Sequence, residues 1–308
     1  MKIDVFAHIL PEKYLKTYAQ KNKAVLEWIE AKNLAVTDID TRLRLMDRYP
    51  DVLQVLTVAQ PALERLVKPD AAVELARIAN DELAELVIKY PDRFVAAAAC
   101  LPVNDMDAAL EEADRAITQL GMKGVQIYSG ADAGPMGDSK FKLLCEKMAG
   151  YDLPIWIHPR SDEVLDEPLF GWPYATAAGM FRLVAMGIFN DYPDIKFITH
   201  HCGSLVPYFE KRIKWIGGDR TRPLVPHPEE HFRKFYNDTA LYGNTNGLMC
   251  GYGFFGADHL LFGTDAPLGP GLGLTMETLK SVERMDIPDA DKEKIFYQNA
   301  VNLLRLPF

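Results

Sequence analysis

The chain has 308 residues, with 34 Lys and Arg against 43 Asp and Glu, which gives a formal net charge of −9 at pH 7. This acidic balance lacks the basic surface that nucleic acids and anionic membranes require, so we expect neither as a partner. Hydrophobic residues make up 48% and charged residues 25%, as in ordinary globular proteins. No stretch approaches about 18 consecutive apolar residues, and the first residues show no signal-peptide pattern, which together predict a cytoplasmic location.

Short apolar runs alternate with segments of helical periodicity along the whole chain. The helix predicted over 70–90 places Leu75, Ala79 and Leu86 on one stripe, and Pro91 ends it. Further helices are predicted over 107–120, 139–149, 203–216, 275–285 and 289–304. Runs that are apolar on both faces are typical of parallel strands covered by helices. The predicted strands are 3–8, 52–58, 94–101, 123–127, 154–158, 195–201, 235–240 and 259–264.

This alternation, repeated about eight times, predicts the α/β class and a (β/α)8 TIM barrel. A doubly wound sheet is the alternative, but no glycine-rich phosphate loop follows any early strand. Two stretches exceed the minimal barrel, residues 9–50 after the first strand and 159–180 after the fifth. Because both follow strands, we expect them to form long loops over the active-site face of a single domain spanning 1–308.

Metal-capable side chains fall at the carboxyl ends of the predicted strands. His8 ends the first strand, His158 the fifth, His200 and His201 the sixth, and Asp265 follows the eighth. A barrel brings these ends to one mouth, where residues distant in sequence converge. Three imidazoles and a carboxylate suit a first-row divalent ion with an open position. We therefore expect a divalent metal, with zinc as the first choice and manganese or iron as alternatives.

The adjacent histidines His200 and His201 and the acidic residue Asp238 each need an assignment to the site or to the structure. His200 and His201 are adjacent on a predicted strand, so their side chains should point to opposite faces. This favours His201 for the site and a structural place for His200. Asp238 lies in the seventh predicted strand, where it either joins the site or anchors the barrel.

The predicted loop after His158 carries candidates for substrate binding. Arg160 could hold a substrate carboxylate bidentately, and Trp172 could stack on an aromatic or dienoic ring. A surface salt bridge and a loop anchor are the alternative interpretations of these residues. Leu169, Phe170 and Trp172 could also close the site of a neighbouring copy, so we expect a homodimer, with a lid over the chain's own site as the alternative.

At these residues the sequence resembles the amidohydrolase-related group that includes aminocarboxymuconate-semialdehyde decarboxylase and the γ-resorcylate-type decarboxylases. The resemblance covers nearly the whole chain and rests on MKIDVFAHILP, IWIHP, FITHHCGSLVPYFEKRI, FYNDTA, LLFGTDAP and FYQNAVNLL, in this order. It implies an amidohydrolase-like barrel in which His8, His158 and Asp265 ligate a metal. It also implies that His201 lies beside the metal-bound water or substrate and that Asp265 carries a proton.

The first strand departs from the pattern of this group. The group usually has His-x-His or Glu-x-His there, whereas this chain has Phe6-Ala7-His8. Phenylalanine cannot ligate a metal, so the usual first ligand is absent. One interpretation is a three-ligand site of His8, His158 and Asp265, completed by His201 or solvent. The other is a metal-free site, as in related lactonases.

The resemblance implies a non-oxidative decarboxylase that acts on a small aromatic or muconate-like carboxylic acid. In that reaction a metal would act as a Lewis acid, and Asp265 or His201 would deliver a proton to the ring or diene carbon. A hydrolase of lactones or amides is the alternative, because a metal-bound hydroxide or a water activated by Asp265 could attack a carbonyl carbon. A degenerate barrel that only binds a small molecule is a third possibility, supported by Phe6 alone.

Overall fold

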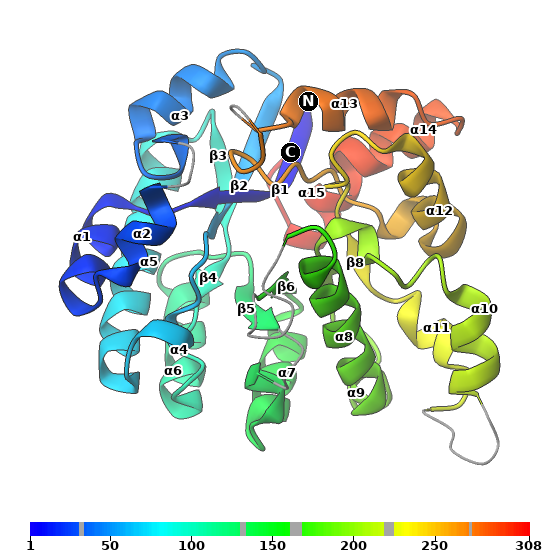
Figure 1. Ribbon diagram of the computed structural model, residues 1–308, viewed down its shortest axis with the longest axis horizontal. Coiled ribbons are helices and arrows are strands. Elements are labelled where there is room, and N and C mark those ends of the chain that lie inside the picture. Colours follow the sequence, from blue (N-terminus) through cyan, green and yellow to red (C-terminus); the bar gives the residue numbers. More distant parts are fainter. Residues whose placement is uncertain (31–33, 130–133, 161–167, 219–224, 271–272) are drawn as a thin grey trace.

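Parallel strands form the centre of the computed structural model, which describes residues 1–30, 34–129, 134–160, 168–218, 225–270 and 273–308 (Figure 1). A first group pairs in the order β1 (Lys2–Ile9), β2 (Val52–Val58) and β3 (Phe94–Ala97). A second group pairs in the order β4 (Ala99–Cys100), β5 (Val125–Ser129), β6 (Ile155–Pro159), β7 (Phe197–Thr199) and β8 (Tyr236–Asn237). Every one of these pairings is parallel, as the apolar runs predict.

The segment after Leu260 closes the ring between the last strand and the first. It forms parallel bridges from Asn237 to Leu260 and from Ala7 to Ala266 instead of a continuous ladder. The amide of Val5 donates to the carbonyl of Phe262 at 2.9 Å across the same seam. The predicted eighth strand therefore takes its place in the barrel, although its pairing is irregular.

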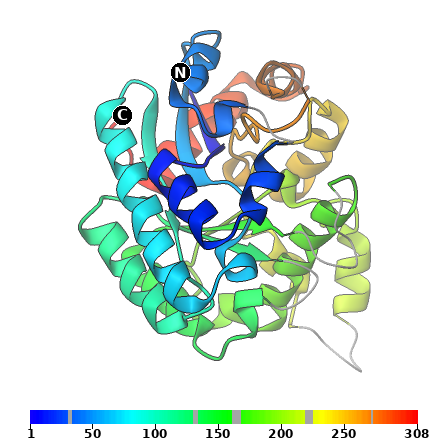
Figure 2. The same cartoon turned by 60° about the vertical axis from the view of Figure 1, so that its left-hand side comes forward.

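Helices surround the strands as an outer layer (Figure 2). Those that precede β5 are α1 (Glu12–Lys21), α2 (Ala24–Glu30), α3 (Ile39–Met46), α4 (Leu63–Leu66), α5 (Pro69–Lys89) and α6 (Met106–Thr118). Those that follow are α7 (Phe141–Tyr151), α8 (Gly171–Ala185), α9 (Ile188–Asp191), α10 (Glu210–Arg212), α11 (Pro228–Phe232), α12 (Thr245–Phe255), α13 (Thr275–Glu283), α14 (Asp289–Glu293) and α15 (Asn299–Leu304). Short 3₁₀ or π turns are η1 (Leu34–Val36), η2 (Gly134–Gly137), η3 (His201–Gly203), η4 (Ile213–Gly217), η5 (Ala257–His259) and η6 (Lys294–Gln298).

The two predicted long loops contain helices. Residues 9–50 include α1, α2 and α3, and α1 packs against α5. Residues 161–167 of the second loop lie outside the described residues, but a long loop is the wrong prediction from Gly171 onward, where α8 begins. Pro173 stands in the first turn of α8, where a missing amide proton costs no helical hydrogen bond. The helix predicted over 203–216 begins only at Glu210. That the two segments cover the active site stays a prediction.

The interior of the barrel is apolar beneath its mouth. A buried cluster includes residues of β1, β2, β3, β6, β7, the closing segment and α15, among them Val5, Val55, Trp156, Ile198 and Leu261. The indole of Trp156 donates to the carbonyl of Val5 at 3.0 Å, so its one polar atom is satisfied inside this cluster. This packed floor leaves the carboxyl ends of the strands as the place for polar chemistry. Within the described residues, no helix is both long and apolar enough to cross a bilayer.

Candidate active site

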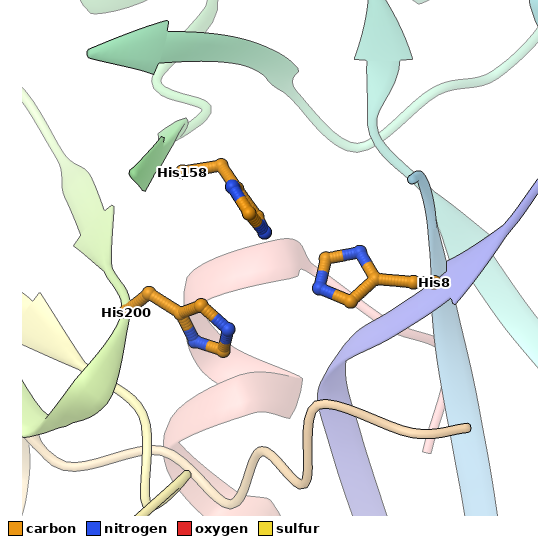
Figure 3. Close-up of side chains that lie close together, drawn as sticks. All are labelled: His8, His158 and His200. Carbon is orange, nitrogen blue, oxygen red and sulfur yellow. The ribbon is translucent and has the colours of Figure 1, made fainter. Parts of the chain in front are cut away.

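Three imidazoles from three strand ends face a common point (Figure 3). His8 lies in β1, His158 in β6, and His200 directly follows β7. One ring nitrogen from each lies within 4.8 Å of the other two. The three side chains are at most 1% exposed, so the cluster is screened from bulk water.

Asp265, which follows the closing segment of the barrel, completes this cluster. Its Oδ1 lies 3.1 Å from Nε2 of His8 and 3.4 Å from Nε2 of His200. The residue has a left-handed backbone, with φ at 63°, a conformation that Asp tolerates better than most residues. The sequence prediction that His8, His158 and Asp265 converge agrees with this geometry.

Each imidazole has an outer partner at its other nitrogen. Nδ1 of His8 lies 2.9 Å from Oγ1 of Thr57, and Nδ1 of His158 lies 2.6 Å from the carbonyl oxygen of Pro159. Nδ1 of His200 contacts Oδ2 of Asp238. A carbonyl or a carboxylate accepts only when Nδ1 carries the proton, which leaves Nε2 with a free lone pair. The outer contacts of His158 and His200 thus direct Nε2 of these two rings towards the cluster as the potential ligand atom.

Three of the converging atoms have no hydrogen bond. Nε2 of His8, Nε2 of His200 and Oδ1 of Asp265 are buried without a hydrogen-bond partner among the described residues. Buried polar atoms are nearly always satisfied, so three unsatisfied atoms facing one point indicate a missing positive charge. Imidazole nitrogens and a carboxylate oxygen form the donor set that first-row divalent ions prefer. The residues present therefore fit a divalent metal.

The charge states of the cluster residues differ, and His200 has to release a proton before it can bind a metal. Burial, the largest effect, lowers the pKa of His8 and lowers that of His158 well below its usual range, so both rings are neutral at pH 7. Burial also acts on His200, but Asp238 and Asp265 outweigh it and raise the pKa of His200 to about 10. Burial opposes ionisation of Asp265, yet contacts with His200 and His8 hold its pKa well below the ordinary value.

The chain turns sharply after β7, and this turn determines where His201 lies. His200 is extended, but His201, Cys202 and Ser204 have φ values of 57°, 53° and 55°, in the left-handed region. The rings of His200 and His201 therefore stack with 4.1 Å between centroids instead of pointing apart. The prediction that His200 is only structural and points away from the site is wrong, because strand alternation ends at Thr199.

His201 lies beside the cluster. It offers a ligand atom within 4.8 Å of those of His200 and Asp265. Burial and the neighbouring His200 lower the pKa of His201 to about 3, so its ring is neutral at pH 7. The role that the resemblance implies for His201, next to a metal or substrate, stays a prediction.

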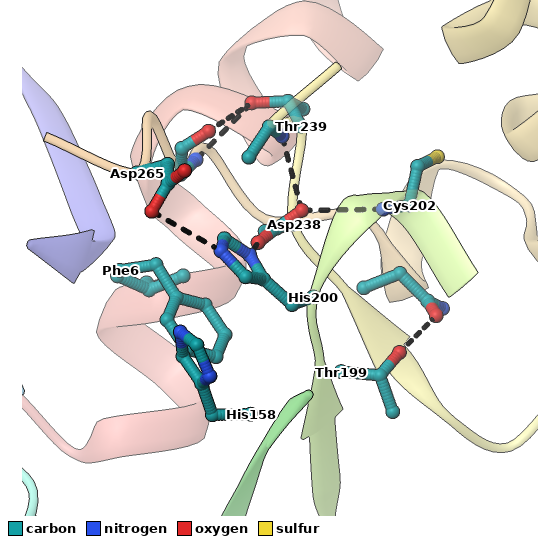
Figure 4. Close-up of polar contacts among 12 residues, drawn as sticks. Phe6, His158, Thr199, His200, Cys202, Asp238, Thr239 and Asp265 are labelled. Atoms are coloured by element: carbon teal, nitrogen blue, oxygen red, sulfur yellow. Dashed lines mark hydrogen bonds and ion pairs between the residues drawn. The ribbon is translucent and has the colours of Figure 1, made fainter. Parts of the chain in front are cut away.

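Asp238 holds the turn after β7 in place (Figure 4). Its Oδ2 contacts Nδ1 of His200, and its Oδ1 accepts from the amides of Cys202 at 3.2 Å and Ala240 at 3.0 Å. One buried carboxylate thus fixes both the ring orientation of His200 and the strained backbone beside it. Sequence reasoning left this residue open, and the strand order β7–β8 is the information that it lacked.

Phe6 fills the position of the usual first ligand. Its side chain is fully buried, and its ring centroid lies 5.8 Å from that of His8 and 6.1 Å from that of His158. The ring cannot bind a metal, but His200 supplies a donor that the three-ligand interpretation did not include. The departure at Phe6 therefore does not reduce the cluster to three donors.

Of the two candidate substrate residues, Trp172 contacts the cluster, and Arg160 pairs with Glu64. Trp172, at the start of α8, presents its ring edge to His158 at 6.2 Å between centroids. Arg160 directly follows β6, is 8% exposed, and has a guanidinium nitrogen 3.9 Å from Oε1 of Glu64.

Sequence reasoning missed Tyr242. The Tyr242 hydroxyl donates to Oδ2 of Asp265 at 3.0 Å, and the residue is 48% exposed. It lies outside the predicted strands and helices, in the turn between β8 and α12, so no periodic signal pointed to it. Its contact joins a buried carboxylate of the cluster to a side chain at the surface.

Comparisons with known proteins agree with this geometry. The profile of the family described as "Amidohydrolase" matches residues 3–306. Gamma-resorcylate decarboxylase from Rhizobium sp. (strain MTP-10005) is 30% identical over 306 residues, which cover 91% of this chain and 90% of that protein. 2-Amino-3-carboxymuconate-6-semialdehyde decarboxylase from Dictyostelium discoideum is 25% identical, covering 99% of this chain and 92% of the other.

A solved structure of a decarboxylase also matches this chain over nearly its whole length. Dihydroxybenzoic acid decarboxylase from Polaromonas sp. JS666, crystallised with bound manganese and the inhibitor 2-nitroresorcinol, superposes with a TM-score of 0.84. It is 29% identical, and the match covers 99% of this chain and 96% of that one. The predicted family resemblance and the (β/α)8 barrel are both confirmed, and the doubly wound alternative is wrong.

Proposed function

The chain belongs to the amidohydrolase family, and we propose that it is a metal-dependent non-oxidative decarboxylase of small aromatic carboxylic acids. One observation carries the proposal: the ligand atoms of His8, His158 and His200 converge, and Nε2 of His8, Nε2 of His200 and Oδ1 of Asp265 are buried with no hydrogen-bond partner among the described residues. The relatives support the reaction type, since those named above are decarboxylases and one of them holds manganese.

The metal would be held by Nε2 of His8, His158 and His200 and by Oδ1 of Asp265. This donor set suits zinc, manganese and iron alike, so the metal is not fixed by ligand type. The manganese bound by the Polaromonas relative makes manganese the first metal to test, ahead of the zinc that the sequence favours. When bound, such an ion supplies a Lewis acid for the substrate carboxylate or an adjacent hydroxyl.

The proton chemistry belongs to the protein. Decarboxylation breaks the bond between the ring carbon and the carboxylate, carbon dioxide leaves, and the ring carbon gains a proton. Asp265 and His201 both lack the proton at pH 7, so either must first take one up. Asp265 has a described donor in the Tyr242 hydroxyl, whereas Nδ1 of His201 has no partner among the described residues. We therefore assign proton delivery to Asp265 and a neighbouring, substrate-facing position to His201.

Arg160 and Trp172 are assigned to the substrate. In this proposal the Arg160 guanidinium holds the acid group bidentately, and the Trp172 ring covers the aromatic ring. Their support is position, because Arg160 follows His158 by two residues and Trp172 contacts the ring of His158. The substrate class follows the relatives, one of which was crystallised as a 2,6-dihydroxybenzoate decarboxylase with 2,6-dihydroxybenzoate. The cytoplasmic location stays a prediction from the sequence, as does the homodimer.

Hydrolysis of a lactone or amide uses nearly the same groups but has less support. The metal-free form of that alternative followed from the missing ligand at Phe6, and His200 now supplies another donor. No described contact favours attack by water over protonation of a carbon atom.

The proposal is tested by release of carbon dioxide. Protein loaded with manganese or zinc is incubated with 2,6-dihydroxybenzoate and other hydroxybenzoates, and the decarboxylated product is measured by chromatography. We expect turnover by the wild type and a loss of about 10²–10⁴-fold in Asp265→Asn, with an unchanged circular dichroism spectrum. Absence of product from every aromatic acid, together with hydrolysis of a lactone panel, would overturn the proposal in favour of the hydrolase.

A further inference from the structure

A buried ion pair lies at the carboxyl ends of β2 and β6. A guanidinium nitrogen of Arg160 lies 3.9 Å from Oε1 of Glu64, and the two side chains are 9% and 11% exposed. Arg160 directly follows β6, two residues after His158, and Glu64 lies in α4, which follows β2. Both residues therefore belong to the face of the barrel where substrates bind.

The chain that leads into α4 is held against the end of β6. Nε2 of Gln60 donates to the carbonyl of Pro159 at 2.8 Å, and Nδ1 of His158 contacts the same carbonyl at 2.6 Å. The Tyr128 hydroxyl donates to the carbonyl of Val58, the last residue of β2, at 2.7 Å. The Tyr128 ring also lies 5.2 Å from the ring of His158, measured between centroids. These contacts connect the surroundings of the ion pair with the imidazole cluster.

The charge of Glu64 acts on other groups at this end of the barrel. Burial, the largest effect, and the Glu64 carboxylate both raise the pKa values of Tyr14, Tyr18, Tyr128 and Cys100. These four groups come from α1, β5 and β4. A negative charge opposes the formation of a second one in its neighbourhood. The field of Glu64 therefore extends across the ends of neighbouring strands.

The ion pair limits the negative charge that a substrate can bring. In the proposed function, the metal and Arg160 hold the reacting carboxylate, and Glu64 offsets one of these positive charges. A second carboxylate near the pair meets Glu64 where both groups are poorly solvated, and like charges repel strongly in such a place. A neutral hydroxyl or amide avoids this repulsion, because it can donate to the Glu64 carboxylate and accept from the Arg160 guanidinium.

We propose that Glu64 is a specificity-determining residue that restricts the site to aromatic acids with a single carboxylate, the one that is lost as carbon dioxide. It acts through its charge and through Arg160, so it is a positioning residue. The inference deepens the proposed function and rests on it for the identity of the reacting group. The other substituents of the substrate ring are then neutral, as hydroxyl groups are.

Binding measurements test this inference without requiring turnover. The matched ligands are 2-hydroxybenzoate, 2-hydroxyisophthalate, which adds one carboxylate, and 3-carbamoyl-2-hydroxybenzoate, whose amide has the same shape without the charge. Isothermal titration calorimetry on the manganese-loaded protein at about pH 7.5 measures their dissociation constants. We expect the wild type to bind the amide about tenfold or more tightly than the diacid, because a like charge near Glu64 is weakly screened.

Three substitutions separate charge from packing. Glu64→Gln keeps the size of the side chain and removes its charge, so the preference for the amide over the diacid should fall about tenfold. Glu64→Asp retains the charge and should retain the preference. Glu85→Gln is the matched control, since it removes a carboxylate that is 65% exposed and pairs with Lys13. A merely structural ion pair would weaken all three ligands together and leave their ratio unchanged, and circular dichroism checks that the variants are folded.

Other results would overturn the assignment of Glu64. An equal preference in wild type and Glu64→Gln would leave the pair with a structural role alone. A wild type that binds the diacid as tightly as the amide overturns the inference even if Glu64→Gln does not fold. Absence of binding by all three ligands removes the pair from a substrate site.

The proposed function is judged by a separate readout. The expected binding ratio without release of carbon dioxide from any aromatic acid contradicts the decarboxylation and leaves the role of Glu64 in charge selection intact. Turnover of 2,6-dihydroxybenzoate together with an unaltered ratio in Glu64→Gln supports the decarboxylation and overturns the role of Glu64.

Discussion

The ring of Phe6 lies nearly parallel to the ring of His200, with 4.3 Å between centroids and 20° between planes. Both side chains are buried, and Figure 4 shows the Phe6 ring beside the imidazoles. Phe6 stands where the resemblance places a first ligand, and here its ring packs against His200, a proposed ligand. An aromatic stack of this kind contributes about 0.5–1.5 kcal/mol beyond its buried area.

Phe6→Ala should separate packing from metal binding. The variant loses the stack and leaves a cavity, so we expect the free energy of unfolding to fall by about 3–5 kcal/mol in guanidinium titrations. Because the phenyl ring donates nothing to a metal, the ion content by mass spectrometry should stay near that of wild type. Phe6→Leu is the milder comparison, with a loss below about 1.5 kcal/mol. A folded Phe6→Ala protein without metal would contradict this interpretation.

Separate replacement of His200 and His201 by alanine tests which of the two histidines binds the metal. The potential ligand atom of His200 lies within 4.8 Å of those of His8 and His158 and also of those of His201 and Asp265. His201 belongs only to the second of these groups, and its ring stacks on that of His200. We expect His200→Ala to lose the bound ion and His201→Ala to retain it after dialysis against manganese or zinc. His201→Ala should still lose activity if it faces the substrate. The reverse pattern of metal content would restore His201 as the ligand and make His200 structural.

Asp238→Asn keeps the size of the side chain but removes its charge. The amide can accept only at its oxygen, so the contacts with His200 and with the amides of Cys202 and Ala240 cannot all persist. Loss of such an outer partner weakens metal binding about 10–100-fold. Competition with a fluorescent chelator measures the change, and Asp258→Asn, which alters a side chain that is 73% exposed, is the control. Equal affinities of the two variants would show that Asp238 only anchors the barrel.

Tyr242→Phe tests the contact between surface and cluster. The variant removes the hydroxyl that donates to Asp265, while its ring stays half exposed, so folding should be nearly unaffected. We expect kcat to fall about tenfold or more with metal content unchanged, because Asp265 is recharged with a proton more slowly. A rise in KM with kcat unchanged, or a loss of metal, would show that the hydroxyl positions substrate or ligand instead.

The barrel could be predicted because local sequence patterns identify its strands. Buried parallel strands are apolar on both faces, and the predicted run 52–58 coincides with β2. The candidate site was expected from the same pattern, since strand ends meet at one mouth and His8 and His158 lie in the strands β1 and β6; that these residues hold a metal stays a prediction. Helix α8 was not predicted, because Gly171, Pro173 and Gly179 have low helix propensity. The helix depends instead on the tertiary packing of its buried face.

The choice between His200 and His201 could not be made from the sequence. Alternation of side chains holds only while the backbone stays extended, and β7 ends at Thr199. The turn that follows takes left-handed φ values at non-glycine residues, which no propensity favours. Asp238, which directly follows the neighbouring strand β8, stabilises that turn through its contacts with His200 and with the amides of Cys202 and Ala240. Such a long-range stabiliser leaves no mark on the local pattern.

Asp4 gives the barrel a pH dependence that is independent of catalysis. This carboxyl group is fully buried in β1 and accepts from the hydroxyl and the amide of Thr264 at 2.5 and 2.9 Å. Burial, the largest effect, raises its pKa from 3.8 to about 7. The folded state therefore binds this proton more tightly than the unfolded state. Its contribution to stability is greatest below about pH 4, declines as the pH rises towards 7, and is constant above.

Asp4→Asn should remove this dependence, since an amide does not titrate. The difference in unfolding free energy between the variant and wild type should shift in favour of the variant by roughly 1.4 kcal/mol per pH unit between pH 5 and 6.5, with little change above pH 8. Guanidinium titrations of both proteins in EDTA measure this difference without a contribution from bound metal. Asp92→Asn, at a carboxylate that is 79% exposed, controls for the loss of one charge. A difference that stays constant from pH 5 to 8 would mean that Asp4 is ionised in the folded protein throughout, with Thr264 compensating the cost of its burial.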